Sequence, residues 1–439
     1  MKFKIHRGAQ EIGGSCVEIW TDSTRVVIDF GMPLVNPDRS RFDSNAIQDK
    51  SKDELLSNGI LPNIPGLYEK SDQTALLLSH AHQDHYGLMR YLHRDCKVYL
   101  GRATLKLIEL TNVFTYQDWT ISNACHFESG GSFTFGDIEV TPYLMDHSAT
   151  DSYAFMIRAG NKTLFYSGDF RLHGRKPGYF EFLRKTASRK VDYLLLEGTT
   201  IGRQEQHMLT ETEIEEALID TFRKSRGISL IYTSGQNIDR LVSIYKACRR
   251  SGKIMTIDFY IANVLKELSK HSAVPHPSPK FPGIRVFYPI NLAKMIMMKG
   301  KKELLYRFRH YKITRDEINA ESGKIVMLVR PSMSDFYKRL DNLGGGYFIY
   351  SMWTGYRDDR NTSEFINYFI DKGMTDTVIH TSGHADREGL GKLVDVLQPK
   401  YIVPIHTFEP RQYERIFSEA NVLRLADGEI CDASGGVSA

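Results

Sequence analysis

The sequence has few cysteines, few tryptophans and no long apolar run. Its 439 residues include five cysteines and three tryptophans. The cysteines are scattered and form no Cys-x-x-Cys pair, which argues against a disulfide framework and against a cysteine-based zinc site. No uncharged apolar stretch approaches the roughly 18 residues that span a bilayer, and the first residues, MKFKIHRGAQEIGG, lack the apolar core of a signal peptide. These absences predict a soluble intracellular protein, most simply a cytoplasmic one.

Several common catalytic signatures are missing as well. The chain contains no Walker A loop, no serine-hydrolase signature and no dinucleotide-binding fingerprint. What remains is an ordinary globular composition, with 41% hydrophobic and 25% charged residues, in a chain long enough for two or three domains.

Positive charge is unevenly distributed along the chain. The formal net charge is only +4. Residues 209–375 nevertheless carry nine more Lys and Arg than Asp and Glu, so the remainder of the chain is acidic by five. A basic block of this kind is typical of a protein that binds a polyanion, because phosphate contacts release counterions. On composition alone, a solvated lysine-rich surface is the simpler explanation.

The pattern of strands and helices predicts one domain interrupted by another. Residues 1–208 alternate short β-branched strands with Gly, Asp and Asn turns. Residues 209–375 instead alternate strands with helices, which is typical of a parallel α/β domain. Residues 376–439 resume the first pattern, beginning with TDTVIH. We therefore expect a first domain at 1–208 and 376–439, with an inserted domain at 209–375.

Acidic and imidazole side chains follow several of the first domain's apolar strands. Asp29 follows VVI, His80 follows ALLLS, Asp169 follows LFYSG, and Glu197 ends YLLLE. Because chemistry in α/β proteins gathers where strands end and loops begin, these four residues are expected to share one site.

The strongest single motif is HAHQDH at residues 80–85. It places three His and one Asp within six positions directly after an apolar strand, which is a dense set of metal-ligand types. Spacing i, i+2 puts His80 and His82 on one side, while Asp84 and His85 lie on the following turn. Two adjacent metal ions fit that arrangement better than one.

This motif and its companions resemble the β-CASP family of metallo-β-lactamase-fold nucleases. HAHQDH resembles the HxHxDH signature, and Asp29, His147 in MDHSA and Asp169 in YSGDF resemble motifs one, three and four. Glu197, His384 in TSGHAD and His406 in VPIHT resemble motifs A, B and C. The resemblance implies a metallo-β-lactamase αββα sandwich interrupted by an inserted parallel α/β β-CASP domain.

The resemblance also implies a role for each of these residues. One metal ion would be held by His80, His82, His147 and Asp169. The second would be held by Asp84, His85 and His406, with Asp169 shared. Imidazole and carboxylate ligands suit Zn²⁺, and Mn²⁺ also fits. Asp29 would fix a ligand imidazole without binding metal.

The same resemblance implies a metal-dependent phosphodiester hydrolase. Asp84 would act at the catalytic metals, and His384, oriented by Glu197, would protonate the leaving oxygen or stabilise the phosphate. A water nucleophile leaves 5′-phosphate and 3′-hydroxyl ends. His406 at motif C favours RNA over DNA, since DNA-processing members typically carry an apolar residue there. Cleavage would be endonucleolytic, 5′-to-3′ exonucleolytic, or both.

Other residues are candidates for binding the substrate. Trp353 and Tyr356 lie in a loop after an apolar strand and could stack on bases. In related exonucleases the backbone that corresponds to Ser382, Gly383 and Ala385 contributes to a terminal-phosphate pocket. Among the histidines outside the motifs, His173 is the one placed to touch substrate. The expected partners are single-stranded RNA and, for assembly, a second copy of the chain or a larger processing complex.

Three alternatives stay open at the level of sequence. A DNA nuclease of the same family would use the same ligands. A small-molecule metallo-hydrolase would also use them, but would not need the basic insertion, His384 or Glu197. A non-catalytic RNA-binding scaffold is disfavoured because every expected ligand type is present.

Overall fold

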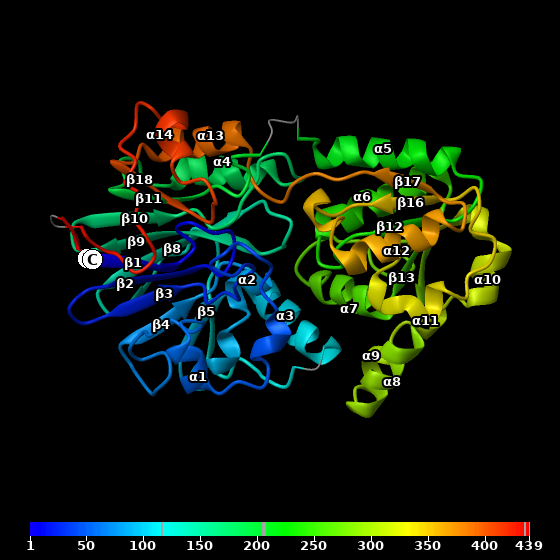
Figure 1. Cartoon of the computed structure of the whole chain (residues 1–439), viewed down its shortest axis with the longest axis horizontal. Helices are drawn as coiled ribbons and strands as arrows, with labels where there is room; N and C mark the ends of the chain where they lie inside the picture. Colours follow the sequence, from blue (N-terminus) through cyan, green and yellow to red (C-terminus); the bar gives the residue numbers. More distant parts are fainter. Residues whose placement is uncertain (116, 204–207, 434–435, 439) are drawn as a thin grey trace.

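The chain folds into two lobes connected by two crossing segments (Figure 1). The computed structural model describes residues 1–115, 117–203 and 208–433, and the backbone of 436–438. One lobe contains the N-terminal part of the chain and its C-terminal return. The other is built from the middle of the chain (Figure 1).

The first lobe contains two sheets. The larger has the order β20-β19-β1-β2-β3-β4-β5-β6. Its strands are β1 (Lys2–Arg7), β2 (Cys16–Trp20), β3 (Arg25–Ile28), β4 (Thr74–Leu77), β5 (Lys97–Leu100), β6 (Ala124–His126), β19 (Ile430–Asp432) and β20 (Gly436–Ser438). The second sheet has the order β18-β11-β10-β9-β8-β7. Its strands are β7 (Phe133–Phe135), β8 (Ile138–Met145), β9 (Ser152–Ala159), β10 (Lys162–Tyr166), β11 (Tyr193–Glu197) and β18 (Tyr401–Ile405).

These two sheets pack face to face over a shared apolar core. Alternate residues of a strand point to the same face, so Phe3 and Ile5 of β1 enter this core together. They meet Leu195 of β11 and Val403 of β18 from the other sheet. Because β18 pairs in parallel with β11, the chain that returns after the second lobe completes the sandwich.

Helices cover the two outer faces of the sandwich. Leu107 and Ile108 of α3 share a core cluster with Leu76 and Val98 of the larger sheet, and Leu390 of α13 lies in a cluster with residues of the other sheet. The helices of this lobe are α1 (Lys52–Ser57), α2 (Gln83–Tyr86), α3 (Arg102–Phe114), α4 (Pro177–Thr186), α13 (Arg387–Leu397) and α14 (Gln412–Ile416). The expected αββα sandwich is therefore confirmed.

The second lobe is a parallel α/β domain, as the strand–helix alternation predicts. All strand pairs of its sheet are parallel, in the order β14-β13-β15-β12-β16-β17. The strands are β12 (Ser229–Tyr232), β13 (Ile254–Asp258), β14 (Ile284–Phe287), β15 (Ile325–Leu328), β16 (Tyr347–Tyr350) and β17 (Thr375–Val378). The helices are α5 (Glu211–Lys224), α6 (Ile238–Ser251), α7 (Phe259–Leu268), α8 (Ile290–Met298), α9 (Lys302–Tyr306), α10 (Arg315–Ala320), α11 (Ser334–Tyr337) and α12 (Arg360–Ile370). Short 3-10 helices occur in both lobes: η1 (Ser44–Ile47) and η2 (Met89–Tyr91) lie in the first, and η3 (Arg309–Tyr311), η4 (Ser322–Lys324), η5 (Pro331–Met333) and η6 (Thr354–Tyr356) lie in the second.

One strand lies in a different sheet from the one that the sequence pattern indicates. The pattern places the segment TDTV at the start of the returning part, but β17 pairs in parallel with β16 of the inserted sheet. The domain boundaries at 208/209 and 375/376 stay a prediction. The pairing of β17 favours an inserted domain that extends through Val378.

A buried ionic network joins the two lobes. Arg171 of the first lobe donates from Nη2 to Asp239 Oδ2 of α6 at 2.7 Å and from Nη1 to Glu211 Oε1 of α5 at 3.4 Å. Arg240 donates to the same Glu211 oxygen at 3.1 Å. Burial raises the pKa of Glu211, but the guanidinium groups of Arg240 and Arg171 lower it more, to about 2. Glu211 is thus ionised at neutral pH, and loss of one partner from such a buried set costs about 3–5 kcal/mol.

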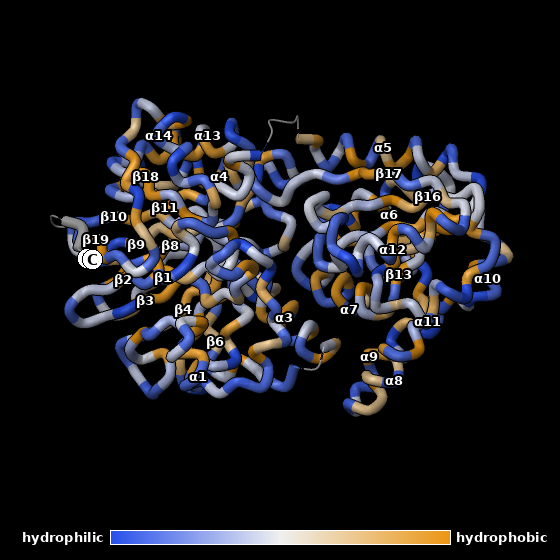
Figure 2. The backbone as a smooth tube through the Cα atoms, in the orientation of Figure 1, coloured by the Kyte–Doolittle hydropathy of each residue, from blue (hydrophilic) through white to orange (hydrophobic). Residues whose placement is uncertain are grey.

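The hydropathy of the chain follows the layers. In Figure 2 the hydrophobic residues gather within the two lobes, and most connecting loops are hydrophilic. Among the residues that the structure describes, none of the helices has both the length and the apolar character needed to cross a membrane.

Candidate metal centre

The HAHQDH segment folds as a short loop followed by one turn of helix. Leu77 ends β4, and His80 lies in the loop beyond it. His82 is extended, with φ −97° and ψ 145°, and is the N-cap of α2, while Asp84 and His85 lie in the helical turn itself. The backbone N–H groups of His85 and Tyr86 donate to His82 O at 2.9 and 3.1 Å, which closes the turn. The segment can therefore direct its ligands to two neighbouring positions, as its spacing indicates.

The other candidate ligands come from strand ends of the second sheet. His147 follows β8, Asp169 follows β10 and His406 follows β18. Gly168 before Asp169 has φ +54°, and a Cβ there would lie 2.5 Å from the carbonyl oxygen of Tyr153. The glycine in SGD is therefore required by the close approach of the backbone.

Two of the predicted residues have a strained backbone. Asp29 has φ +61° and His406 has φ +54°, although neither is a glycine. The His406 N–H donates to Gly8 O at 2.7 Å, which helps to hold this conformation. Such left-handed residues cost on the order of 1–3 kcal/mol each and cluster at functional sites.

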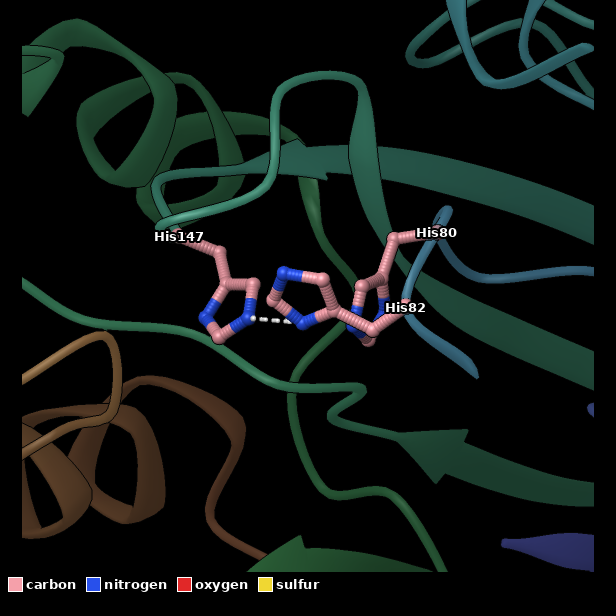
Figure 3. A group of neighbouring side chains, drawn as sticks. All are labelled: His80, His82 and His147. Carbon is pink, nitrogen blue, oxygen red and sulfur yellow. Dashed lines mark hydrogen bonds between the residues drawn. The ribbon is translucent and has the colours of Figure 1, made fainter. Parts of the chain in front are cut away.

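Three histidines form the first group of candidate ligands. One ring nitrogen from each of His80, His82 and His147 lies within 4.8 Å of the others (Figure 3). His147 Nε2 and His82 Nδ1 are 3.3 Å apart, and His147 Nδ1 donates to Gly383 O at 2.5 Å. Burial lowers the pKa of His82 to about 4 and holds the pKa values of His80 and His147 well below the usual value. All three imidazoles are therefore neutral at neutral pH, which is the form that binds metals.

One atom of this group has no partner within the described part of the chain. His80 Nε2 is buried and makes no hydrogen bond, while Nδ1 of the same ring lies 3.0 Å from Ser79 Oγ. A buried polar nitrogen without a partner is costly, and a metal ion would satisfy it. The donor set of this group therefore fits a divalent cation.

Asp84, His85 and His406 form a second group. The Oδ2 atom of Asp84 lies 3.4 Å from His406 Nε2 and 3.7 Å from His85 Nε2. Burial raises the pKa of Asp84, but the charges of His85 and His406 lower it more, so the carboxylate is ionised. Burial also lowers the pKa of His85, but the surrounding carboxylates raise it well above the usual value; these are Asp169, Asp29 and Asp84. The excess of negative charge at this position is the environment that a cation requires.

Asp169 lies between the two groups. Its Oδ2 atom is 3.1 Å from His85 Nε2 and 3.8 Å from His80 Nε2, and its Oδ1 atom is 3.8 Å from His406 Nδ1. Although burial raises the pKa of Asp169, the charges of the histidines around it hold the pKa well below its usual range. An ionised carboxylate in this position can contact ions in both groups.

Asp29 supports the ligands from behind. Its Oδ2 atom accepts hydrogen bonds from His85 Nδ1, Ser79 Oγ and Tyr166 Oη, each at 2.8 Å. With Nδ1 held by Asp29, Nε2 of His85 is the nitrogen that a metal ion would bind in place of a proton. This arrangement agrees with a supporting role for Asp29.

Four contacts at the site were not predicted from the sequence, although Gly383 was named as a candidate for binding the substrate. Ser79 and Tyr166 bind Asp29, Gly383 O accepts from His147, and Thr199 Oγ1 lies 2.8 Å from His406 Nδ1. A polar residue next to a predicted ligand, as in Ser79-His80 and Tyr166-Ser-Gly-Asp169, is the only sequence signal for two of them. The other two are brought in by the tertiary fold.

His384 and Glu197 form a pair beside Asp169. His384 Nδ1 lies 3.3 Å from Glu197 Oε1, and the same oxygen accepts from the N–H groups of Phe170 and Ala385 at 3.3 and 3.4 Å. Burial lowers the pKa of His384, but the carboxylates of Glu197 and Asp169 raise it more, so the net shift is upward. With Nδ1 held by Glu197, Nε2 is the nitrogen available to a substrate atom. His384, Glu197, Asp169 and His406 also offer a further set of neighbouring ligand atoms.

The predicted substrate-binding residues fall into two groups. Around His384, Ser382 O accepts from His173 Nε2 at 2.9 Å and from Arg171 Nη1 at 3.1 Å, and Ala385 is buried. His173 therefore contacts the motif B loop.

At the edge of the site, Trp353 and Tyr356 are 42% and 43% exposed and their rings lie 5.0 Å apart. Burial raises the pKa of Tyr356, and the charge of the Asp84 carboxylate raises it further.

Comparisons with known proteins agree with this geometry. Residues 53–227 match the family model described as a beta-lactamase superfamily domain, and residues 374–414 match a Zn-dependent metallo-hydrolase RNA specificity domain. The chain is 21% identical to ribonuclease J of Mycoplasma genitalium, over 98% of this chain and 71% of that protein. It is 23% identical to ribonuclease J2 of Bacillus subtilis, over 91% of this chain and 68% of that protein.

Other relatives are considerably longer than the region matched. Ribonuclease J of Helicobacter pylori strain B128 is 23% identical over 91% of this chain, but the match spans only 55% of that protein. Among solved structures, a protein of unknown function from Enterococcus faecalis V583 aligns with a TM-score of 0.77 at 20% identity, over 98% of this chain and 99% of that one. This likeness supports the fold.

Proposed function

We propose that the chain is a β-CASP member of the metallo-β-lactamase fold and a metal-dependent ribonuclease that hydrolyses RNA phosphodiester bonds. The observation that carries the proposal is the cluster of neutral imidazoles and ionised carboxylates around His80 Nε2, which is buried without a partner within the described structure. The match of residues 374–414 to an RNA specificity domain, which contains His384 and His406, favours RNA over DNA as substrate.

The cofactor in this proposal is a pair of Zn²⁺ ions, with Mn²⁺ as the substitute. His80, His82, His147 and Asp169 would hold one ion. Asp84, His85 and His406 would hold the other, with Asp169 shared. Bound there, the ions would activate a water molecule and neutralise charge on the phosphate.

The chain's own residues have separate tasks in the reaction. Asp169 and Asp84 supply the negative charge that holds the cations. Glu197 fixes His384 through Nδ1 and keeps its pKa raised, so that Nε2 carries a proton to deliver to the leaving 3′-oxygen. Asp29 keeps His85 in the tautomer that a metal requires. Attack by water then leaves 5′-phosphate and 3′-hydroxyl ends.

Single-stranded RNA is the substrate best supported by the surroundings of the site. The inserted domain carries the chain's excess of Lys and Arg, which favours a polyanion. The exposed aromatic residues Trp353 and Tyr356 offer stacking surfaces for unpaired bases. Assembly with a second copy of the chain, or into a larger processing complex, stays a prediction.

The proposal is tested by cleavage of matched single-stranded RNA and DNA, each with a 5′-monophosphate. We expect RNA to be cut, chelation to abolish cleavage, and added Zn²⁺ or Mn²⁺ to restore it, because both ligand groups require a cation. Product lengths would separate endonucleolytic from exonucleolytic cutting.

Three results would contradict this expectation. Cleavage of DNA alone would mean that the protein is a DNA nuclease of the same family. Cleavage that survives complete removal of metal would exclude the proposed centre. Hydrolysis of a thioester or lactone by the metal-loaded protein, with neither polymer cut, would favour a small-molecule hydrolase.

A further inference from the structure

A cation and an aromatic ring from different parts of the chain meet at the edge of the metal centre. Arg203 follows β11 by six residues and is exposed. Trp353 is the N-cap residue of η6, in the loop after β16 of the inserted domain. The guanidinium carbon of Arg203 lies 4.8 Å from the centroid of the Trp353 ring.

The pair lies close to the residues assigned to catalysis. Burial lowers the pKa of Arg203, and the charge of the Glu197 carboxylate opposes that shift. The Arg203 charge in turn opposes the upward shift in the pKa of His384. The Trp353 ring is in contact with Tyr356, whose pKa is raised by burial and by the charge of Asp84. Arg203 is therefore within electrostatic range of the candidate acid His384, and Trp353 is joined to Arg203 through the cation–ring contact.

Two neighbouring arginines are already engaged, whereas Arg203 is not. Arg41 donates to Asp359 at 2.7 Å, and Arg39 donates to Phe408 O at 3.5 Å. Within the described residues, the Arg203 side chain forms no ion pair and no hydrogen bond, and its interaction is the contact with Trp353. Its five N–H donors are thus available to an anion, and a planar guanidinium suits phosphate in particular.

We propose that Arg203 and Trp353 form a nucleotide-binding subsite, in which Trp353 stacks on an unpaired base and Arg203 binds an adjacent phosphate. This inference rests on the proposed ribonuclease function and adds to it a reason for single-strand preference. Base pairs in a duplex are stacked on both faces, so the indole can reach a base only in a single strand. The subsite requires no base-specific hydrogen bond, so it tolerates any sequence.

The test measures RNA affinity in the full-length, zinc-loaded chain carrying His384→Ala, which slows cleavage. The probe is a fluorescein-labelled single-stranded RNA, and anisotropy is followed over a range of salt concentrations. Arg203→Ala should weaken binding about tenfold near 0.1 M salt and reduce the slope of log K against log salt by about 0.7, because one phosphate contact is lost. Arg203→Lys should restore the slope, because it keeps the charge.

Trp353→Ala should show a different signature. It should weaken binding roughly tenfold with no change in slope, because stacking releases no counterion. It should also reduce the preference for single-stranded over duplex RNA, and Trp353→Phe should recover part of both losses. Arg94→Ala, which removes an exposed arginine that pairs with Asp95, is the matched control and should change neither affinity nor slope.

The outcomes distinguish this inference from the function on which it rests. If the parent binds RNA and both alanine variants match it in affinity and slope, the subsite is wrong and the ribonuclease proposal stands. If Arg203→Ala loses affinity but keeps the slope, Arg203 only supports the fold and the phosphate contact is overturned. If the parent itself binds no RNA, both proposals fail together.

Discussion

Replacing Asp169 by alanine is expected to abolish RNA cleavage and to remove bound metal. Asp169 is the carboxylate within reach of both ligand groups, through His85 and His80 on one oxygen and His406 on the other. Its loss leaves a cluster of imidazoles without the charge that holds the cations. We expect kcat/KM for RNA to fall by more than about 10³-fold, since charge stabilisation of the transition state depends on those cations.

Metal content and cleavage should be measured on the same preparation of this variant. Asp137→Ala removes an exposed aspartate from the turn between β7 and β8 and is the matched control, with unchanged metal and activity. Asp169→Asn keeps the volume of the side chain and should also lose metal, which separates loss of charge from a cavity. If Asp169→Ala retains its full metal content and cleaves RNA at the wild-type rate, the shared-carboxylate arrangement is wrong.

Replacing His384 by alanine should slow cleavage but, unlike the loss of Asp169, should leave the bound metal in place. His384 is held by Glu197 and lies outside the two proposed ligand groups, so metal content should be preserved. Loss of a general acid should lower kcat by about 10²–10⁴-fold. His126→Ala, at the end of β6, is the matched control and should leave kcat unchanged.

A chemical substitution in the RNA tests the role of His384 more sharply. A 3′-bridging sulfur makes the leaving group depart without a proton, so an enzyme that lacks its general acid should recover on this substrate. On the sulfur-bridged RNA we expect the kcat of His384→Ala to come within about tenfold of the wild-type kcat. If His384→Ala lowers kcat equally on the ordinary and the sulfur-bridged RNA, His384 binds or positions the phosphate and does not donate a proton.

The site is predictable from sequence wherever its chemistry is local. HAHQDH can be recognised because four candidate ligands, three His and one Asp, lie within six residues. The structure divides it between an extended loop and the turn of α2, as the spacing indicates. Asp29, His147, Asp169, Glu197, His384 and His406 could be found because each follows or ends an apolar strand or matches a family motif. Their roles, as metal ligands or as supporting and proton-donating groups, stay predictions until metal binding and cleavage are measured.

The partners of those residues are not predictable in the same way. His147 is oriented by the carbonyl of Gly383, 236 residues away, and His406 lies against Thr199, 207 residues away. A carbonyl oxygen has no sequence signature, and a threonine after a strand is common in turns that have no functional role. The contact between Arg203 and Trp353 likewise exists only because the segment after β11 and the loop after β16 meet in the folded chain.

The fold shows the same division between local and tertiary information. The parallel inserted domain follows from strand–helix alternation, which is a local pattern. A local pattern does not say to which sheet the segment TDTV belongs, because these four residues could form a strand in either domain. Its pairing with β16 is decided by the position of the whole strand at the edge of the inserted sheet.

The central claim is that bound metals direct a water molecule at an RNA phosphodiester. The measurement that tests it most directly is cleavage of single-stranded RNA in H₂¹⁸O, with mass spectrometry of the product ends. The account predicts one ¹⁸O atom in the new 5′-phosphate and an unlabelled 3′-hydroxyl on the other fragment. A 2′,3′-cyclic phosphate without ¹⁸O, formed by attack of the neighbouring 2′-hydroxyl, would contradict it.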